Sequence, residues 1–209
     1  MNITRDKIIA WIEAFAAVLS ENKAYLTELD SPIGDADHGI NMDRGFQAVL
    51  NKLPSVSNQD IGAIFKMVGM TLVSTVGGAS GPLYGTYFIQ LGMVTNGKLE
   101  LTLEDWISAV ESGLNGVIRR GKANPGDKTM IDSLLPGLEA LKAAANDGAN
   151  LADALEKSAA AVEQGMKDTI PLVAKKGRAS YLGERSAGHQ DPGATSSYFL
   201  FKTAAEVLP

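Results

Sequence analysis

The stretch TRDKIIAWIEAFAAVLSENKAY, residues 4–25, sets the pattern that most of the chain repeats. Its apolar side chains recur three and four positions apart, which is the spacing of one face of an α-helix. These side chains are Ile8, Trp11, Ile12, Phe15 and Leu19. Arg5 and Lys7 ahead of an apolar run resemble the start of a signal peptide, but Glu13 interrupts that run. We therefore interpret the segment as an amphipathic helix.

Seven further segments show helical spacing of their apolar residues. They cover residues 41–53, 59–76, 82–94, 102–120, 129–145, 151–174 and 193–207. Thr102 and Asp105 resemble a capping box, and Pro171 ends or bends the segment that contains it. No stretch alternates with a period of two, so we expect no strands. Short loops between helices favour antiparallel neighbours, so the sequence predicts an all-α single domain over residues 1–209, a barrel or bundle of about eight antiparallel helices.

Composition excludes several classes of protein. The 209 residues are 45% hydrophobic and 21% charged, which is typical of a globular chain with an ample core. A net charge of −5 argues against a general nucleic-acid binder, because such proteins neutralise phosphates with Lys and Arg. The absence of cysteine excludes disulfides, thiolate catalysis and cysteine-based zinc sites, and two histidines are too few for a multi-histidine metal site. The apolar stretch 67–79 is shorter than the ~20 residues of a membrane span, so we expect no membrane segment and a cytoplasmic location.

Glycine is abundant, with 22 residues. Several lie inside the helical segments, where we expect them to allow close helix–helix approach: Gly62, Gly69, Gly85, Gly92, Gly113, Gly116 and Gly165. Most of the others cluster in four polar loops, at residues 29–41, 77–82, 121–129 and 175–193. These loops follow the first, third, fifth and seventh helical segments. Because alternate connections of an up-and-down bundle lie at one end, we expect the four loops to form a single composite site.

The first loop reads LDSPIGDADHGIN, residues 29–41, and carries Asp30, Asp35 and Asp37. Like charges this close repel each other unless a cation holds them or they cap helix ends. Carboxylate oxygens suit Mg²⁺ or Ca²⁺. The spacing does not fit an EF-hand, because Phe46 stands where the final Glu belongs. An aspartate-rich turn that caps the next helix is the alternative.

The second and third loops both precede helices. GGASGP, residues 77–82, can offer backbone N–H groups to an anion, or it can be a turn of small residues for tight packing. GKANPGDKT, residues 121–129, resembles a Walker A loop with Asp127 inserted and without the preceding strand. Lys122 and Lys128 could approach a phosphate, but taken alone this loop is better explained as a plain helix connection.

The fourth loop, KKGRASYLGERSAGHQDPG, residues 175–193, lacks helical periodicity, and loops of this length are usually functional or mobile. Arg178 and Arg185 offer bidentate binding of phosphate oxygens. His189 beside Asp191 could be an oriented base, but no nucleophile motif supports a hydrolytic triad. Together the four loops supply carboxylates for Mg²⁺, amides for phosphate and arginine for developing charge. This set of groups is typical of phosphoryl transfer without a protein nucleophile.

The motifs in residues 29–46, 77–83, 126–130, 177–186 and 188–194 resemble those of the L, or nucleotide-binding, subunit of dihydroxyacetone kinases, in the same order along nearly the whole chain. The resemblance implies a barrel of eight antiparallel helices with the nucleotide at one end. It implies that Asp30, Asp35 and Asp37 hold two Mg²⁺ ions that bridge the nucleotide phosphates. Arg178 would stabilise charge on the transferring group.

The resemblance also implies a set of residues that contact ADP or ATP. These are His38, Gly39, Ile40, Asn41, Ala79, Ser80, Gly121, Met130, Arg178, Asp191, Pro192 and Gly193. Gly121 and Met130 would flank the adenine, and Ala79 and Ser80 would line the phosphate and ribose region.

The resemblance further implies two partner chains. A K subunit holds dihydroxyacetone, and an M subunit of the phosphotransferase system carries a phosphohistidine that rephosphorylates the tightly bound ADP in place. Three alternatives stay open: the L part of an ATP-dependent dihydroxyacetone kinase, a nucleotide-sensing module that reports to a transcriptional regulator, and a purely structural helical bundle. The acceptor sugar is not fixed by this chain, because its pocket would lie on a partner.

Overall fold

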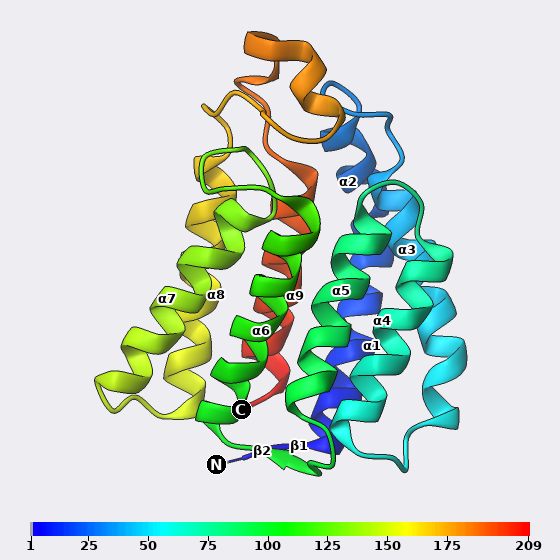
Figure 1. Cartoon of the computed structure of the whole chain (residues 1–209), viewed down its shortest axis with the longest axis vertical. Helices are drawn as coiled ribbons and strands as arrows, with labels where there is room; N and C mark the ends of the chain where they lie inside the picture. The colour runs from blue at the N-terminus through cyan, green and yellow to red at the C-terminus, as the bar shows by residue number, and fades with distance from the viewer. Residues whose placement is uncertain (1) are drawn as a thin grey trace.

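Up-and-down helices dominate the structure, a computed structural model that describes residues 2–209 (Figure 1). The α-helices of this part of the chain are α1 (Arg5–Glu21), α2 (Lys23–Asp30), α3 (His38–Lys52), α4 (Ile61–Thr75), α5 (Ser80–Val94), α6 (Leu103–Gly121), α7 (Ile131–Asn146), α8 (Leu151–Asp168) and α9 (Pro192–Val207). Two 3₁₀ helices, η1 (Leu53–Ser55) and η2 (Arg178–Ser186), lie in the connections. The predicted all-α fold is confirmed.

An aromatic cluster joins helices that are distant in sequence. The Trp11 ring meets the Trp106 ring edge-on at 5.3 Å between centroids, and it lies 6.1 Å from the Phe88 ring. Phe15 and Phe46 make a second edge-on pair at 4.8 Å. Such pairs add about 0.5–1.5 kcal/mol each beyond the burial of their surface. The cluster therefore fixes α1 against α3, α5 and α6, and the apolar face expected of α1 is buried in it.

The glycines inside α4 and α5 confirm the expected close helix approach. A Cβ atom on Gly69 would lie 2.6 Å from the Gly85 carbonyl oxygen, and a Cβ on Gly85 would lie 2.8 Å from the Gly69 carbonyl oxygen. Gly62 and Gly92 make the same reciprocal contact elsewhere along the two helices. A Cβ on Gly62 would lie 2.8 Å from the Gly92 carbonyl oxygen, and a Cβ on Gly92 would lie 2.7 Å from the Gly62 carbonyl oxygen. The two backbones therefore approach each other closely at these two pairs of glycines.

The first helical segment divides in two. The chain turns at Asn22, whose side-chain amide donates to the Val18 carbonyl at 2.9 Å and whose backbone leaves helical geometry. A separate helix, α2, then runs on to Asp30, five residues beyond the predicted end at Tyr25. In α2 only Leu26 and Asp30 are buried, so its weak apolar pattern gave no clear signal.

The expectation of no strands is wrong. Two short strands, β1 (Ile3–Thr4) and β2 (Glu100–Leu101), pair antiparallel with Ile3 opposite Leu101. Two residues are too few to show alternation. Nearby, the Lys7 ammonium donates to the carbonyl oxygens of Leu208, at 3.1 Å, and Pro209. Both ends of the chain therefore lie at the lower end of the barrel in Figure 1.

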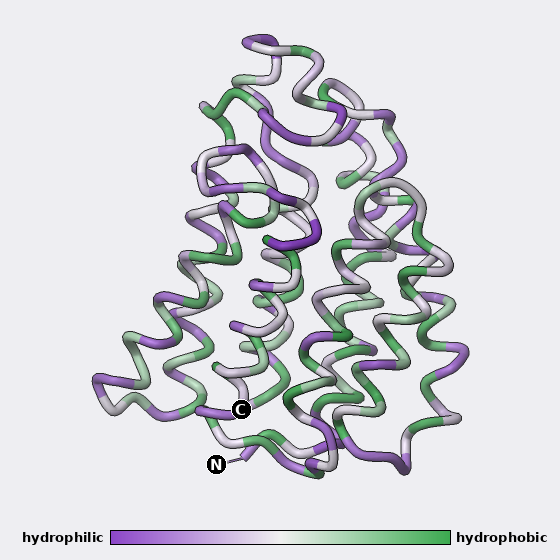
Figure 2. The backbone as a smooth tube through the Cα atoms, in the orientation of Figure 1, coloured by the Kyte–Doolittle hydropathy of each residue, from purple (hydrophilic) through white to green (hydrophobic). Residues whose placement is uncertain are grey.

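The four polar loops lie together at the upper end, as the helix order predicts (Figure 1). In Figure 2 the backbone at this end of the barrel is coloured mostly as hydrophilic. Helix α8 ends at Asp168 rather than near Ala174, and η2 occupies the middle of a loop for which we expected no helix. The backbone of Gly183, with φ 54°, kinks η2. None of the described helices is long and apolar enough to cross a membrane.

We expect Gly69→Ala to lower the free energy of unfolding by about 1–3 kcal/mol, because the added methyl group meets the Gly85 backbone and outweighs the ~1 kcal/mol gain in helix propensity. Met70→Ala is the matched control on the same helix, because its side chain is 67% exposed and should change stability by less than ~0.5 kcal/mol. Urea unfolding of the two variants measures both values. Equal stability of Gly69→Ala and the unsubstituted protein would contradict this account of α4 and α5.

Candidate functional site

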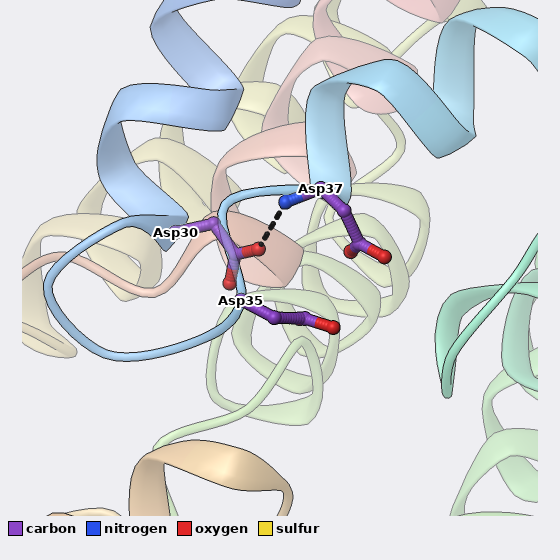
Figure 3. A group of neighbouring side chains, drawn as sticks. All are labelled: Asp30, Asp35 and Asp37. Carbon is purple, nitrogen blue, oxygen red and sulfur yellow. Dashed lines mark hydrogen bonds between the residues drawn. The ribbon is translucent and has the colours of Figure 1, made fainter.

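The aspartate loop connects α2 to α3 and is held by Asp30. One oxygen of the buried Asp30 carboxylate, Oδ2, accepts hydrogen bonds from the N–H groups of Asp37, at 2.9 Å, and His38, at 3.2 Å (Figure 3). The Asp30 carbonyl accepts from the Gly34 N–H at 2.6 Å. A Cβ on Gly34 would lie 1.9 Å from the other carboxylate oxygen, so this glycine leaves the space that Asp30 occupies. Asp30 therefore caps α3 from outside that helix.

The three aspartates converge. One carboxylate oxygen from each of Asp30, Asp35 and Asp37 lies within 4.8 Å of the other two. Asp37 makes no side-chain capping bond to α3, although it is the residue before that helix. Figure 3 shows its carboxylate and that of Asp35 pointing to the same side of the loop. A cluster of hard oxygen ligands with one buried and two accessible members fits Mg²⁺, which usually keeps waters or phosphate oxygens in its shell.

The start of α5 meets α3 through a histidine. His38 Nδ1 lies 3.0 Å from Ser80 Oγ, and Nε2 lies 2.9 Å from Ser196 Oγ on α9. Burial lowers the pKa of His38 to about 4, although the nearby charges of Asp30 and Asp37 act to raise it. The ring is therefore neutral near pH 7 and carries one N–H. Gly78, with φ 65°, allows the tight turn before Ser80.

Lys128 has a structural role. Its side chain is 2% exposed, and its ammonium donates to the carbonyls of Thr169, at 2.7 Å, Ile170, at 3.3 Å, and His189. Burial lowers its pKa, opposed by the charges of Asp191 and Asp132. These contacts join the connection between α6 and α7 to the segment between α8 and α9. The three ammonium donors are directed at backbone carbonyls, although Lys128 also lies in the wall of the cavity. A contact of Lys128 with phosphate stays a prediction.

The segment that carries η2 lies over the aspartates. Arg178, at its first position, makes an ion pair with Asp35 at 2.9 Å between Nη2 and Oδ2. Both side chains keep substantial contact with solvent, so this pair contributes little to stability. At the other end of the segment, Asp191 caps α9 by accepting from the Ala194 N–H at 2.7 Å. Burial raises the pKa of Asp191 to about 7.

All four loops line one cavity of about 470 Å³. Most residues predicted for the site lie in its wall: Asp30, Asp35, Asp37, His38, Ala79, Ser80, Gly121, Met130, Arg178, Asp191, Pro192 and Gly193. The carboxylates of the first loop thus share a cavity with the Ser80 turn and with Arg178. The predicted composite site at one end of the barrel is confirmed as a geometric feature.

Three predicted residues do not line this cavity. A Cβ on Gly39 would lie 2.1 Å from the Lys23 carbonyl, so Gly39 packs against α2. The Ile40 side chain, 45% exposed, faces a separate shallow hollow beside α2. Asn41 accepts a hydrogen bond from Arg44 at 2.7 Å. The contact of these three residues with a nucleotide stays a prediction.

The cavity also contains residues that the sequence did not single out. Leu83, Val117 and Ile131, at helix ends, supply an apolar wall, while Arg120 and Lys176 add positive charge. The first three and Arg120 lie in segments with helical periodicity, which did not distinguish them from ordinary core or surface positions, whereas Lys176 lies in the fourth loop. Arg185, which the sequence indicated as a phosphate contact, is not among the lining residues. A ligand that bears several negative charges and a flat apolar group, bound with divalent cations, matches this lining.

We expect Lys128→Met to lower the free energy of unfolding by about 2–5 kcal/mol, because it leaves buried carbonyls without their donor. Lys122→Met, an exposed position in the same connection, is the control and should change stability by less than ~0.5 kcal/mol. Denaturant unfolding measures both. A Lys128→Met variant as stable as the control would show that the ammonium does not hold the two segments together.

Comparison with known proteins agrees with this geometry. The DAK2 domain matches residues 32–206. The ADP-binding subunit DhaL of PEP-dependent dihydroxyacetone kinase from Escherichia coli is 49% identical to this chain, over 98% of each sequence. The subunit of the same name from the PTS-dependent kinase of Lactococcus lactis is 45% identical, over 99% of each.

The solved dihydroxyacetone kinase of C. freundii has the same fold over 95% of this chain and 34% of its own, with a TM-score of 0.73 and 26% identity. Its complex with AMP-PNP and Mg²⁺ superposes with a TM-score of 0.72, at 26% identity, over 95% of this chain and 33% of its own. The extent of the domain match and the identity to full-length relatives lead to one conclusion: the chain belongs to the DAK2 domain family.

Proposed function

We propose that this chain is the ADP-binding subunit of a cytoplasmic, PEP-dependent dihydroxyacetone kinase, a phosphotransferase. The observation that carries the proposal is the single cavity in which Asp30, Asp35 and Asp37 lie with Ser80 and Arg178. It is supported by full-length relatives whose names state this role. The acceptor, dihydroxyacetone, would be held by a K subunit, and a phosphohistidine on an M subunit would rephosphorylate the bound ADP.

In this proposal the three aspartates hold two magnesium ions. Their oxygens lie within 4.8 Å of one another, and Gly34 leaves room for the Asp30 carboxylate. Bound Mg²⁺ would neutralise phosphate charge and clamp the attacking and leaving oxygens in line. Because Asp30 Oδ2 already accepts two N–H groups, its Oδ1 atom is the one left for a metal. When metal binds, Asp35 would leave its ion pair with Arg178 and become a ligand of the metal.

The rest of the cavity fits the nucleotide. Ser80 and the first N–H groups of α5 bind phosphate oxygens, since a helix N-terminus favours anions. Gly121 and Met130 flank the base beside the apolar wall. Arg178, released from Asp35, stabilises the charge that spreads over the transferring group. The acceptor hydroxyl, and the base that takes its proton, belong to the K subunit.

The relatives are of two kinds, separate ADP-binding subunits and longer kinases, and their identity to this chain bears on the choice between the PEP-dependent and the ATP-dependent role. The separate ADP-binding subunits are 43–49% identical to this chain. The longer kinases, such as the L-erythrulose 1-kinase of Mycolicibacterium smegmatis, are 32% identical or less, and the chain covers about a third of their length. The higher identity favours the PEP-dependent role. Nothing in the described residues points to a transcriptional regulator, so that contact stays an expectation from the sequence.

We expect ADP to copurify with the chain and to resist exchange during dialysis. Phosphorylation of dihydroxyacetone in the presence of the K subunit should then depend on the PEP-linked donor chain and proceed poorly with free ATP. Turnover is measured as dihydroxyacetone phosphate formed with each donor. Rapid turnover with free ATP alone would favour the ATP-dependent role instead.

We expect Asp35→Ala to reduce phosphoryl transfer by at least ~100-fold, because loss of a metal ligand removes several kcal/mol of charge stabilisation. Circular dichroism and unfolding should be unchanged, since the Asp35 side chain is exposed. Asp147→Ala, an exposed position where α7 ends, is the control. Retained transfer with unaltered Mg²⁺ affinity would remove Asp35 from the metal site.

A further inference from the structure

One arginine of α3, Arg44, binds the end of α4 although it does not line the cavity. Its Nε atom donates to the Thr75 carbonyl at 3.1 Å, and its Nη2 atom donates to Asn41 Oδ1 at 2.7 Å. Thr75 is the last residue of α4, so its carbonyl has no partner within that helix, and the helix dipole favours a cation there. The guanidinium therefore ties the end of α4 to α3.

The turn that follows α4 packs against α3 at the same place. A Cβ on Gly45 of α3 would lie 2.1 Å from Val76 Cγ2, so this glycine makes room for the buried Val76 side chain. A Cβ on Gly77 would lie 3.3 Å from Asn41 Oδ1 and 3.6 Å from Arg44 Nη2. The back of the turn therefore lies directly on the hydrogen-bonded pair of Arg44 and Asn41.

The front of the same turn faces the cavity. The residues that line the cavity wall here are Gly77, Gly78, Ala79 and Ser80. Within residues 2–209, no backbone carbonyl accepts a hydrogen bond from the N–H groups of residues 77–79. N–H groups that lead into a helix are well suited to bind an anion. The turn thus presents donors to the cavity while Arg44 holds it from behind.

The sequence of this turn does not fix its shape. Gly77 and Gly78 are adjacent, Gly78 adopts φ 65°, and glycine loses more conformational freedom on ordering than any other residue. Contacts from neighbouring helices must therefore select one shape. At the α5 end Ser80 Oγ lies 3.0 Å from His38 Nδ1, and at the α4 end Arg44 supplies the polar contacts.

We infer that Arg44 is a positioning residue, which holds the turn of residues 76–80 in the shape in which its N–H groups meet the nucleotide phosphates. This inference rests on the proposed function, which supplies the nucleotide. Arg44 acts through the turn and not by touching a phosphate, since it lies behind the turn and outside the cavity wall. Its two bonds come from one planar group, so the shape of the guanidinium is needed as well as its charge.

Calorimetry of the full chain with Mg-ADP and with adenosine tests this role. Arg44→Met should raise the dissociation constant of Mg-ADP about tenfold, because the turn loses two hydrogen bonds from a charged group. The dissociation constant of adenosine should change less than about twofold, because adenosine has no phosphate and the residues proposed to flank its base lie on another loop. Equal losses for the two ligands would indicate a general effect on the fold and would overturn the inference.

Arg119→Met is the matched control. Arg119 is an exposed arginine near the end of α6 that does not line the cavity, and its Nη2 atom donates to Gln90 Oε1 at 3.4 Å. Both dissociation constants should stay within about twofold of their original values in this variant, and urea unfolding should show both variants folded. A loss of Mg-ADP affinity as large as that of Arg44→Met would assign the effect to net charge and refute the positioning role.

Arg44→Lys separates position from charge at the same site. Lysine keeps the positive charge, but its ammonium cannot reproduce the planar fork between Asn41 and the Thr75 carbonyl. We expect this variant to lose at least about threefold in affinity for Mg-ADP. Full affinity in Arg44→Lys would show that charge alone is enough, and the inference would then be wrong.

Hydrogen–deuterium exchange without nucleotide gives a readout that needs no ligand. The last turn of α4, where the Val76 N–H donates to the Leu72 carbonyl at 3.0 Å, should exchange faster in Arg44→Met, while the last turn of α6 should not change. Unchanged exchange at the end of α4 would contradict the inference. If the unsubstituted chain does not bind Mg-ADP, the proposed function fails and the inference fails with it. If it binds Mg-ADP and Arg44→Met binds it equally well, only the inference fails.

Discussion

The Asp30 carboxylate is the interaction on which the site depends. Its negative charge stands at the last residue of α2, where the helix dipole disfavours an anion, and at the start of α3, where the dipole favours one. The two N–H groups from which it accepts hydrogen bonds belong to Asp37, the residue before α3, and to His38, the first residue of α3. This arrangement fixes the loop so that Asp35 and Asp37 reach the same side, and it sets His38 as the first residue of α3.

The sequence predicts the helices well because their apolar faces repeat over many turns. Turns and very short strands are harder to predict, because each depends on only a few residues. The turn at Asn22 depends on one amide bonded to Val18, and the β1–β2 pair rests on two residues per strand. Even so, helix order alone was enough to place the four loops at one end, because antiparallel neighbours leave no other arrangement.

Some residues of the site can be recognised from the sequence, and others can be recognised only from the fold. Asp30, Asp35 and Asp37 are visible in sequence because three carboxylates within eight positions need an explanation. The partnership of His38 with Ser196 joins residues 158 positions apart, and no spacing rule reveals it. The carbonyl partners of Lys128 are equally hidden in the sequence, since Thr169, Ile170 and His189 lie 41, 42 and 61 positions away. A contact that depends on side-chain direction can be found only once the fold is known.

The pairing of β1 with β2, together with the contact of Lys7 with the last residues of the chain, gathers both ends of the protein at the pole remote from the cavity. Material joined to either end would start from the pole opposite the cavity. The protein can therefore be immobilised on a sensor surface through either terminus with its nucleotide end facing the solution. The same geometry allows fluorophores at the two ends to report on barrel integrity without entering the site.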